Sequence, residues 1–425
     1  MFWKAKGGGK QLFSVMLRLV NLSSKFIILS IIAKFGTTED VAVFGLYWAG
    51  LVIASTLMGW DVYNHTARVI LKESELSVSV INRHLGFVII SAIPFPIVAA
   101  LILHEYVSLP GWLYVVFYLH VSLEFFSQEI TRLLIPLKHP QLSVVLSFFR
   151  SSFWIFPVVI YIFASEPESL LVSTVLFWCV GSLFSSILAF CFIKSSCSGS
   201  SEYIFPKVDF NWIFNSIKSS LIIFFSGMVL RFILSLDKFL IGNMLDYDVL
   251  AVYTLYASVI FSLVSMMEVG VSAWRYPHLI EQINSKDSKN AVISMKKFFK
   301  DSFLFGVFFF TCISVSFPVY VNYFLSGTYY ESINGFYILM CASFIYSLTV
   351  PAHYIIYGLR SDKFLLFINL LGLLSMFIWA LVVIPLGIMP PVISAVFMLF
   401  VSLITISIFR VFFSRILWSR HDWEI

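Results

Sequence analysis

Apolar residues occur along this chain in long stretches separated by short polar segments. A helix needs about 20 mostly apolar residues to cross a bilayer. The pattern predicts such helices at 12–33, 41–62, 84–103, 111–134, 142–164, 169–193, 211–235, 250–272, 302–323, 335–357, 364–387 and 391–413. We therefore expect an all-α integral membrane protein with about twelve transmembrane helices.

Several of these stretches carry charged residues away from their ends, namely Arg18, Lys25, Glu124, Arg150 and Arg231. A charge at a helix centre costs about 2.5–3.5 kcal/mol on insertion scales. A chain that retains such residues is expected to line a polar path with them. This pattern indicates a transporter.

Composition excludes other classes of protein. Hydrophobic residues make up 60% of the chain and charged residues 12%, whereas about 25% of a soluble domain is charged. The net charge of +5 does not indicate nucleic-acid binding, because the basic residues are scattered over short loops. The five cysteines fall in expected helices or inner segments, so we expect no disulfide and no metal site.

Lys and Arg concentrate in cytoplasmic loops of membrane proteins. With the N-terminus placed inside, basic residues fill alternate loops, and only Lys34 and Lys238 fall in the outer ones. The outer loops carry acids instead, such as Glu39 and Asp246. We therefore expect a multi-pass protein with both termini cytoplasmic.

Two segments of the chain align without gaps at an offset of 209, at 41–47 and 250–256, with four of seven positions identical. Both begin an expected helix just after an acidic outer loop. A duplicated six-helix unit predicts two pseudo-symmetric bundles around a central cavity, a plan that places substrate between the repeats. The domains are expected to be 1–200 and 201–425, meeting in a Ser-rich inner loop.

Local motifs add a resemblance to a known family. Asp237–Gly242 has an acid-base pair followed by apolar residues and Gly, 250–253 opens the next helix, and Pro277 lies past its end. The segment 33–36 is the N-terminal counterpart. In these features the chain resembles the bacterial polysaccharide (O-antigen) flippase family of the superfamily that includes multidrug extruders. Ala251 departs from the Gly usual in that family.

The resemblance implies translocation of undecaprenyl-diphosphate-linked oligosaccharide repeat units from the cytoplasmic to the periplasmic leaflet of the bacterial inner membrane. It implies a cationic central cavity, contact with membrane lipids, and a polysaccharide polymerase and chain-length regulator as partners. It implies no enzyme chemistry and no cofactor, with transport coupled to a proton or sodium gradient. The chain has no Walker A loop, which argues against ATP hydrolysis.

The candidate substrate-binding residues are the deep cations Arg18, Lys25, Arg150 and Arg231. Arg18 and Lys25 share one face of their helix at a seven-residue spacing, and such cations suit a diphosphate. Alternatively, Arg18 extends to the inner headgroups, and Lys25 pairs with an acid. Arg231 is expected either to pair with Asp237 or to meet the sugar.

The acidic candidates for ion coupling or charge pairing are Glu124, Asp61 and Glu268. Glu124 is interpreted either as the structural partner of Lys25 or Arg150 or as a group that takes up a proton. Asp61 and Glu268 approach inner helix ends, where they form gating pairs with nearby Arg residues or are simply solvated.

Two rival functions remain open. A cation-coupled multidrug extruder of the same superfamily has the same helices, but extruders of organic cations favour acidic and aromatic linings. A membrane-embedded polysaccharide polymerase is expected to have a large outer loop with basic residues, which this chain lacks.

Overall fold

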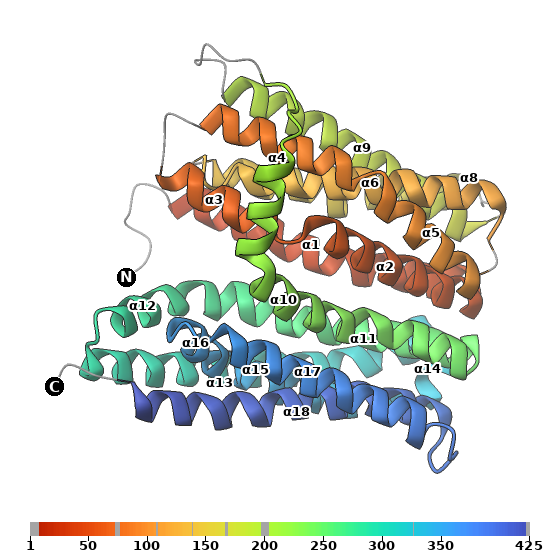
Figure 1. Ribbon diagram of the computed structural model, residues 1–425. Coiled ribbons are helices and arrows are strands. Elements are labelled where there is room, and N and C mark those ends of the chain that lie inside the picture. The colour runs from red at the N-terminus through yellow and green to blue at the C-terminus, as the bar shows by residue number, and fades with distance from the viewer. Residues whose placement is uncertain are drawn as a thin grey trace. The chain divides into compact units, whose positions relative to one another are not determined.

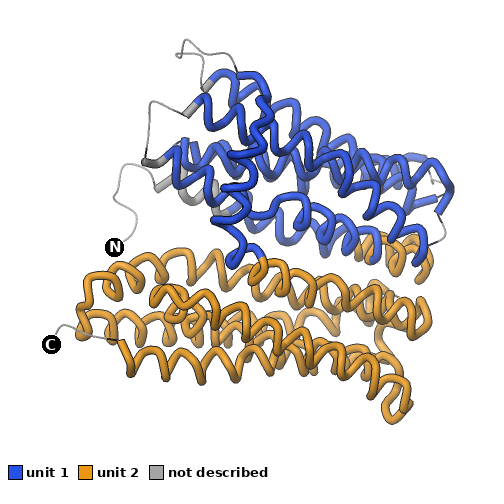
Figure 2. Tube along the Cα trace, viewed as in Figure 1, with its two compact units in different colours: residues 1–28, 46–224 blue, residues 29–45, 225–425 orange. Residues whose placement is uncertain are grey.

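The computed structural model describes residues 8–72, 77–107, 109–137, 139–165, 169–196, 204–325 and 327–421. These residues form helices joined by short turns, and no β-strand occurs among them (Figure 1). The chain divides into two compact units, shown in Figure 2: residues 1–28 with 46–224, and residues 29–45 with 225–425. The boundary expected at 200/201 lies outside the described residues.

Unit 1 contains the helices that correspond to the first six expected spans. These are most of α1 (Gly8–Phe35) and α2 (Thr38–Gly59), then α3 (Val62–Lys72), α4 (Ser77–Ser91), α5 (Pro94–Tyr106), α6 (Gly111–Leu133), α7 (Pro140–Phe148), η2 (Phe149–Phe153), α8 (Ile155–Ser165) and α9 (Leu170–Ser196). The first part of α10 (Phe210–Met244) also belongs to unit 1.

Unit 2 contains the rest of α10 and the helices that follow it. These are α11 (Tyr247–Met267), η3 (Glu268–Ser272), α12 (Ala273–Asn284), α13 (Ser288–Phe324), α14 (Gly327–Glu331), α15 (Ile333–Leu348), α16 (Val350–Gly358), α17 (Asp362–Ile378), η4 (Trp379–Val383) and α18 (Pro391–Arg420). The C-terminal end of α1 and the N-terminal end of α2 belong to this unit, and Thr38 donates a hydrogen bond to Asp248 there.

Eleven helices of the described chain are long and apolar enough to cross a membrane. The remaining expected span, 111–134, is the 23-residue helix α6. It has the required length, but Glu124, Glu129 and Arg132 lower its apolarity. The all-helical membrane architecture predicted from the sequence is therefore confirmed.

Several helices are interrupted where the hydrophobic pattern gives no warning. η2, η3 and η4 are five-residue π-helical turns, a rare conformation that is frequent at functional sites. Between α2 and α3, Trp60 and Asp61 both have positive φ, at 44° and 48°. For a bulky residue such as Trp60 this conformation is uncommon, and it breaks the helix sharply.

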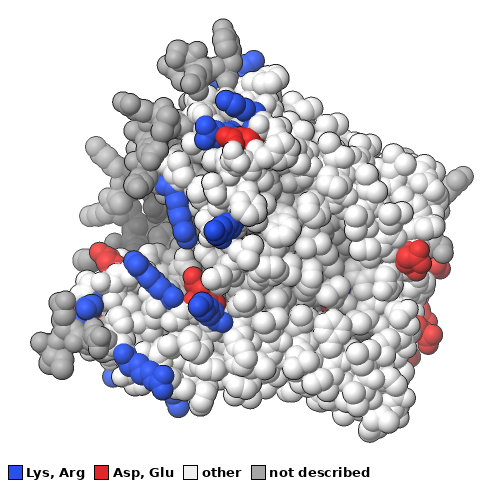
Figure 3. Space-filling model, viewed as in Figure 1, with Lys and Arg blue, Asp and Glu red and all other residues white. Residues whose placement is uncertain are grey.

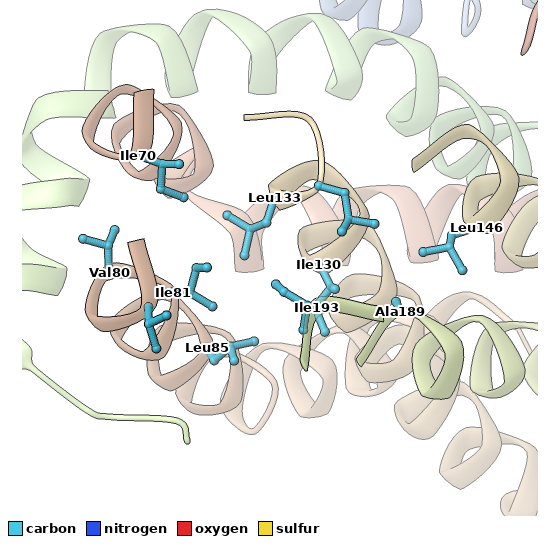
Figure 4. Close-up of a cluster of buried hydrophobic side chains, with 11 residues drawn as sticks. Ile70, Val80, Ile81, Leu85, Ile130, Leu133, Leu146, Ala189 and Ile193 are labelled. Atoms are coloured by element: carbon cyan, nitrogen blue, oxygen red, sulfur yellow. The ribbon is translucent and has the colours of Figure 1, made fainter. Parts of the chain in front are cut away.

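Figure 4 shows the hydrophobic cluster at one end of unit 1, where Ile81 and Leu85 of α4 face Ile130 and Leu133 of α6. All four side chains are fully buried. Burial of one such side chain stabilises the fold by about 1.5–3 kcal/mol relative to exposure in water. The cluster fixes α4 against α6 and α9 and so positions the polar groups of α6.

The segment that enters α10 is fastened to α4. Lys207 N donates to Asn82 O at 2.8 Å, and Phe205 N donates to the Asn82 side chain at 2.9 Å. A Cβ atom on Gly86 would lie 2.2 Å from Lys207 O, so only glycine permits this approach. Asp209 then accepts from Trp212 N at 3.0 Å and begins α10.

Candidate functional site

A buried ion pair lies within unit 1, between α6 and η2. Arg150 Nε lies 3.0 Å from Glu124 Oε1, and the two side chains are 15% and 12% exposed. Ser182 Oγ of α9 donates to the other carboxylate oxygen at 2.9 Å. Of the alternatives left open by the sequence for Glu124, the structure places it in a direct pair with Arg150.

The π-turn η2 joins this ion pair to α1. Ser152 Oγ lies 2.6 Å from Asn21 Oδ1 and 3.0 Å from Ser24 Oγ. Ser24 Oγ in turn lies 3.3 Å from the backbone oxygen of Ser151. The wide turn therefore contains both Arg150, which pairs with Glu124, and the serines that contact Asn21 and Ser24 of α1.

Aromatic rings surround the same region of unit 1. Trp178 stacks on Trp154 with ring centroids 5.2 Å apart and meets His120 at 4.8 Å. Gly181 makes room for Trp154, because a Cβ there would lie 2.9 Å from the Trp154 Cβ. Tyr47 Oη lies 2.9 Å from His120 Nδ1. These rings are buried, so they shape the site and leave ligand contact to the groups around it.

The two candidate cations of α1 are exposed. Arg18 and Lys25 lie seven residues apart on this helix. The Lys25 ammonium lies 4.0 Å from the centroid of the Trp48 ring. This distance is within the range of a cation–π interaction. The structure thus brings Lys25 close to the aromatic cluster, while Arg150 is neutralised by Glu124.

A second polar network was not predicted from the sequence. His84 of α4 is fully buried. Its Nδ1 lies 2.9 Å from Thr66 Oγ1, and its Nε2 lies 3.2 Å from Glu129 Oε2. Arg132 NH1 contacts the other oxygen of Glu129 at 2.9 Å. This network ties α3 and α4 to α6.

Asp61 and Arg231 are both partly buried, in different units. Asp61 forms part of the sharp break that ends α2. Near Arg231 on α10, Asp237 is fully buried. Lys238 Nζ lies 3.2 Å from the Asp237 carboxylate. Tyr253 of α11 donates to the same carboxylate at 2.5 Å. Asp237, in the first segment of the sequence motif, is therefore bound by Tyr253, in its second segment at 250–253.

Unit 2 carries one deep cation that the sequence reading missed. Arg410 of α18 is 2% exposed, and its NH2 group donates to Tyr346 Oη at 3.0 Å. Glu268, the first residue of η3, is exposed and interacts electrostatically with Arg410. The sequence does show Arg410 within an apolar run. However, it lies near the end of the expected helix, where basic residues that flank a membrane span are common.

Among the described residues, no group of three or more His, Cys, Asp or Glu is arranged to hold a metal ion. The polar groups described above are cations, carboxylates and buried aromatic rings.

No protein-family model and no curated relative matches this chain. Solved structures do match in fold. An inward-facing multidrug resistance MATE family transporter of the MOP superfamily is 11% identical, with a TM-score of 0.69 over 97% of this chain and 99% of that one. An outward-facing conformation of a multidrug resistance MATE family transporter of the MOP superfamily gives 11% identity and a TM-score of 0.62 over 98% of this chain and 96% of that one.

A further match is a MOP superfamily transporter from Pyrococcus furiosus whose binding pocket is described as having reversed polarity. It is 10% identical, with a TM-score of 0.61 over 96% of this chain and 95% of that one. At such low identity the likeness concerns the fold. This chain is therefore a multi-pass membrane protein with the two-lobed transporter fold of the MATE proteins of the MOP superfamily.

Proposed function

We propose that this protein is a flippase that moves undecaprenyl-diphosphate-linked oligosaccharide repeat units from the cytoplasmic to the periplasmic leaflet of a bacterial inner membrane. The observation that carries the proposal is the pair of exposed cations on the membrane helix α1, Arg18 and Lys25. Cations exposed to hydrocarbon are costly. A water-filled path that receives an anionic headgroup satisfies them without that cost.

Lys25 is the central residue of this proposal. The diphosphate cannot cross hydrocarbon unaided, because burial of unpaired charge is strongly unfavourable. Lys25 offers a point charge beside the ring of Trp48. Arg18 and Arg231 are proposed to contact the headgroup or the sugar at other steps of the passage.

The Arg150–Glu124 pair provides a way to couple transport to an ion gradient. While Glu124 is ionised, it neutralises Arg150 at 3.0 Å. Protonation of Glu124, or binding of sodium to it, would release the guanidinium to bind a phosphate. In this proposal Glu124 links the cation gradient to substrate binding, and Asp61 and Glu268 have supporting roles near the inner helix ends.

The distribution of charge supports an orientation with both termini in the cytoplasm. In the view of Figure 3, Lys and Arg side chains are seen only toward the left, where some acidic side chains lie among them, and the charged side chains seen at the right are acidic. Under the positive-inside rule the basic end is cytoplasmic. A polysaccharide polymerase and a chain-length regulator are the proposed partners on the periplasmic side.

Complementation of a gene deletion tests the proposal. The deletion should abolish surface polysaccharide and leave lipid-linked repeat units in the inner leaflet. Lys25→Ala should fail to restore export, whereas Lys25→Arg should retain part of it. Lys194→Ala, which removes an exposed basic residue of α9, is the matched control. Accumulation of the lipid-linked units in the periplasmic leaflet would show that the protein acts after flipping.

The multidrug alternative is favoured by one observation: structural neighbours with the same fold include a multidrug resistance MATE family transporter. An extruder of organic cations needs a free carboxylate in its path, and Glu124 is already paired with Arg150. Drug-resistance assays in an extruder-deficient strain distinguish the two functions. Resistance conferred by the wild type and lost in Glu124→Gln would favour the extruder.

A further inference from the structure

Arg410 is a buried cation with few partners. Its guanidinium lies over the Tyr346 ring, 4.4 Å from the centroid, and donates one hydrogen bond to the Tyr346 hydroxyl. Its Nε atom is buried and has no partner among the described residues. A guanidinium has five N–H donors, so most of its hydrogen-bonding capacity is unused.

The charge of Arg410 is also incompletely balanced. Within the described part of the chain, no acidic side chain lies at ion-pair distance from it. Glu268 and His353 both interact electrostatically with Arg410, but neither forms a direct ion pair with it. His353 Nδ1 is itself buried without a partner. An unpaired buried charge is strongly destabilising, so this arrangement fits a site that receives an anion.

The depth of Arg410 indicates which anion it meets. α18 begins at Pro391, and 19 residues of helix separate it from Arg410, a rise of about 28 Å. The hydrocarbon core of a bilayer is about 30 Å thick. With Pro391 placed at one boundary of the hydrocarbon core, Arg410 lies close to the opposite boundary, beside the layer of lipid phosphates. Arg150, by the same measure about 15 Å from Pro140, lies near mid-membrane.

We propose that Arg410 binds a phosphate group of the lipid-linked substrate in the leaflet from which it is taken, before the headgroup reaches the deeper cations. The fork of a guanidinium matches phosphate oxygens, and such charge-assisted hydrogen bonds are strong. Glu268 serves as the distant counter-ion while the site is empty and competes with the phosphate. This loading site rests on the proposed flippase function and on the orientation given above.

Binding of geranylgeranyl diphosphate to the purified full chain in detergent tests the site, with geranylgeraniol as the uncharged control. The wild type should bind the diphosphate and not the alcohol. Arg410→Met, which keeps the length of the side chain, should weaken binding about tenfold or more. Arg410→Lys should lie between the two. Glu268→Gln should strengthen binding several-fold, because it removes the competing charge.

The matched control is Arg415→Ala, which removes an exposed charge from the same helix and should bind as the wild type does. Inorganic diphosphate separates a lipid headgroup from a free phosphate as the ligand, and equal binding of both would overturn the loading role. If the wild type binds no diphosphate at all, the flippase proposal fails as well. If it binds and both Arg410→Met and Glu268→Gln leave the affinity unchanged, only the loading site is wrong. Should Arg410→Met not fold, the Lys and Gln variants decide the question.

Discussion

The two units each hold a buried or mostly buried arginine and a glutamate that acts on it, and they differ in whether the two side chains form a direct ion pair. In unit 1 the arginine sits in a π-turn, and Arg150 contacts Glu124 at 3.0 Å. In unit 2 the glutamate begins a π-turn, and Glu268 influences Arg410 without a direct pair. The Arg150 charge is therefore neutralised within unit 1, whereas the Arg410 charge in unit 2 has no carboxylate at ion-pair distance among the described residues.

The largest expected effect on stability comes from breaking the direct ion pair between Arg150 and Glu124. Arg150→Met leaves Glu124 buried without its cation, which should lower the free energy of unfolding by about 3–5 kcal/mol. Denaturant unfolding in mixed micelles measures the loss. The double variant with Glu124→Gln removes both charges and should recover more than half of it. A single variant as stable as the wild type would show that the pair is not formed in the membrane.

A smaller effect on stability is expected from substitution of Arg410, which forms no direct ion pair with Glu268. Arg410→Met removes one charge-assisted hydrogen bond to Tyr346 but also removes an unpaired buried charge, so the two effects oppose each other and the loss should be at most about 1–2 kcal/mol. The same unfolding assay compares it with Arg150→Met. Equal losses in the two variants would mean that Arg410 has a hidden acidic partner, and the contrast between the units would disappear.

The connection between η2 and α1 should contribute still less. Ser152→Ala removes the hydroxyl that contacts Asn21 and Ser24. Loss of neutral hydrogen bonds of this kind costs about 1 kcal/mol. Ser219→Ala, at a more exposed hydroxyl of α10, is the control. If the two variants are equally stable, the hydroxyl contributes nothing to the placement of Arg150.

The smallest effect concerns the exposed start of α13. Hydrogen bonds from Asn290 to Asp287 hold the pKa of that carboxyl below its ordinary value of 3.8. A lowered pKa stabilises the helix start above pH 3.8, and the contribution disappears as the pH falls through the folded-state pKa. Amide exchange of the first turn of α13 should therefore quicken in acid, and Asp287→Ala should remove that dependence. Unchanged exchange in the variant would contradict this.

The sequence predicted the membrane helices well because burial in lipid requires a continuous apolar run. It also identified Arg150 and Glu124, because a charge within such a run is conspicuous. It could not select between Arg150 and Lys25 as the partner of Glu124. That choice depends on the π-turn at 149–153, which adds a residue to one helical turn without any change in apolarity.

Other residues were missed for a different physical reason. His84 directly follows Asn82 and Arg83, two residue types that are common at protein surfaces. Its contacts come from Thr66 and Glu129, which lie on two other helices. Arg410 lies where basic flanks are common, and its burial follows from the packing of α18 against α15 and α16. Tertiary contacts of this kind have no local signature in the sequence.

The attachment of Lys207 and Phe205 to Asn82 has a consequence for biosynthesis. The backbone face of α4 around Gly86 stays uncovered until the ribosome has made residues 205–208, which follow α9. Domains tend to fold as they are made, N-terminal first. A truncated product that ends near residue 200 lacks the segment that binds α4. Such a product therefore leaves the backbone of α4 around Gly86 exposed.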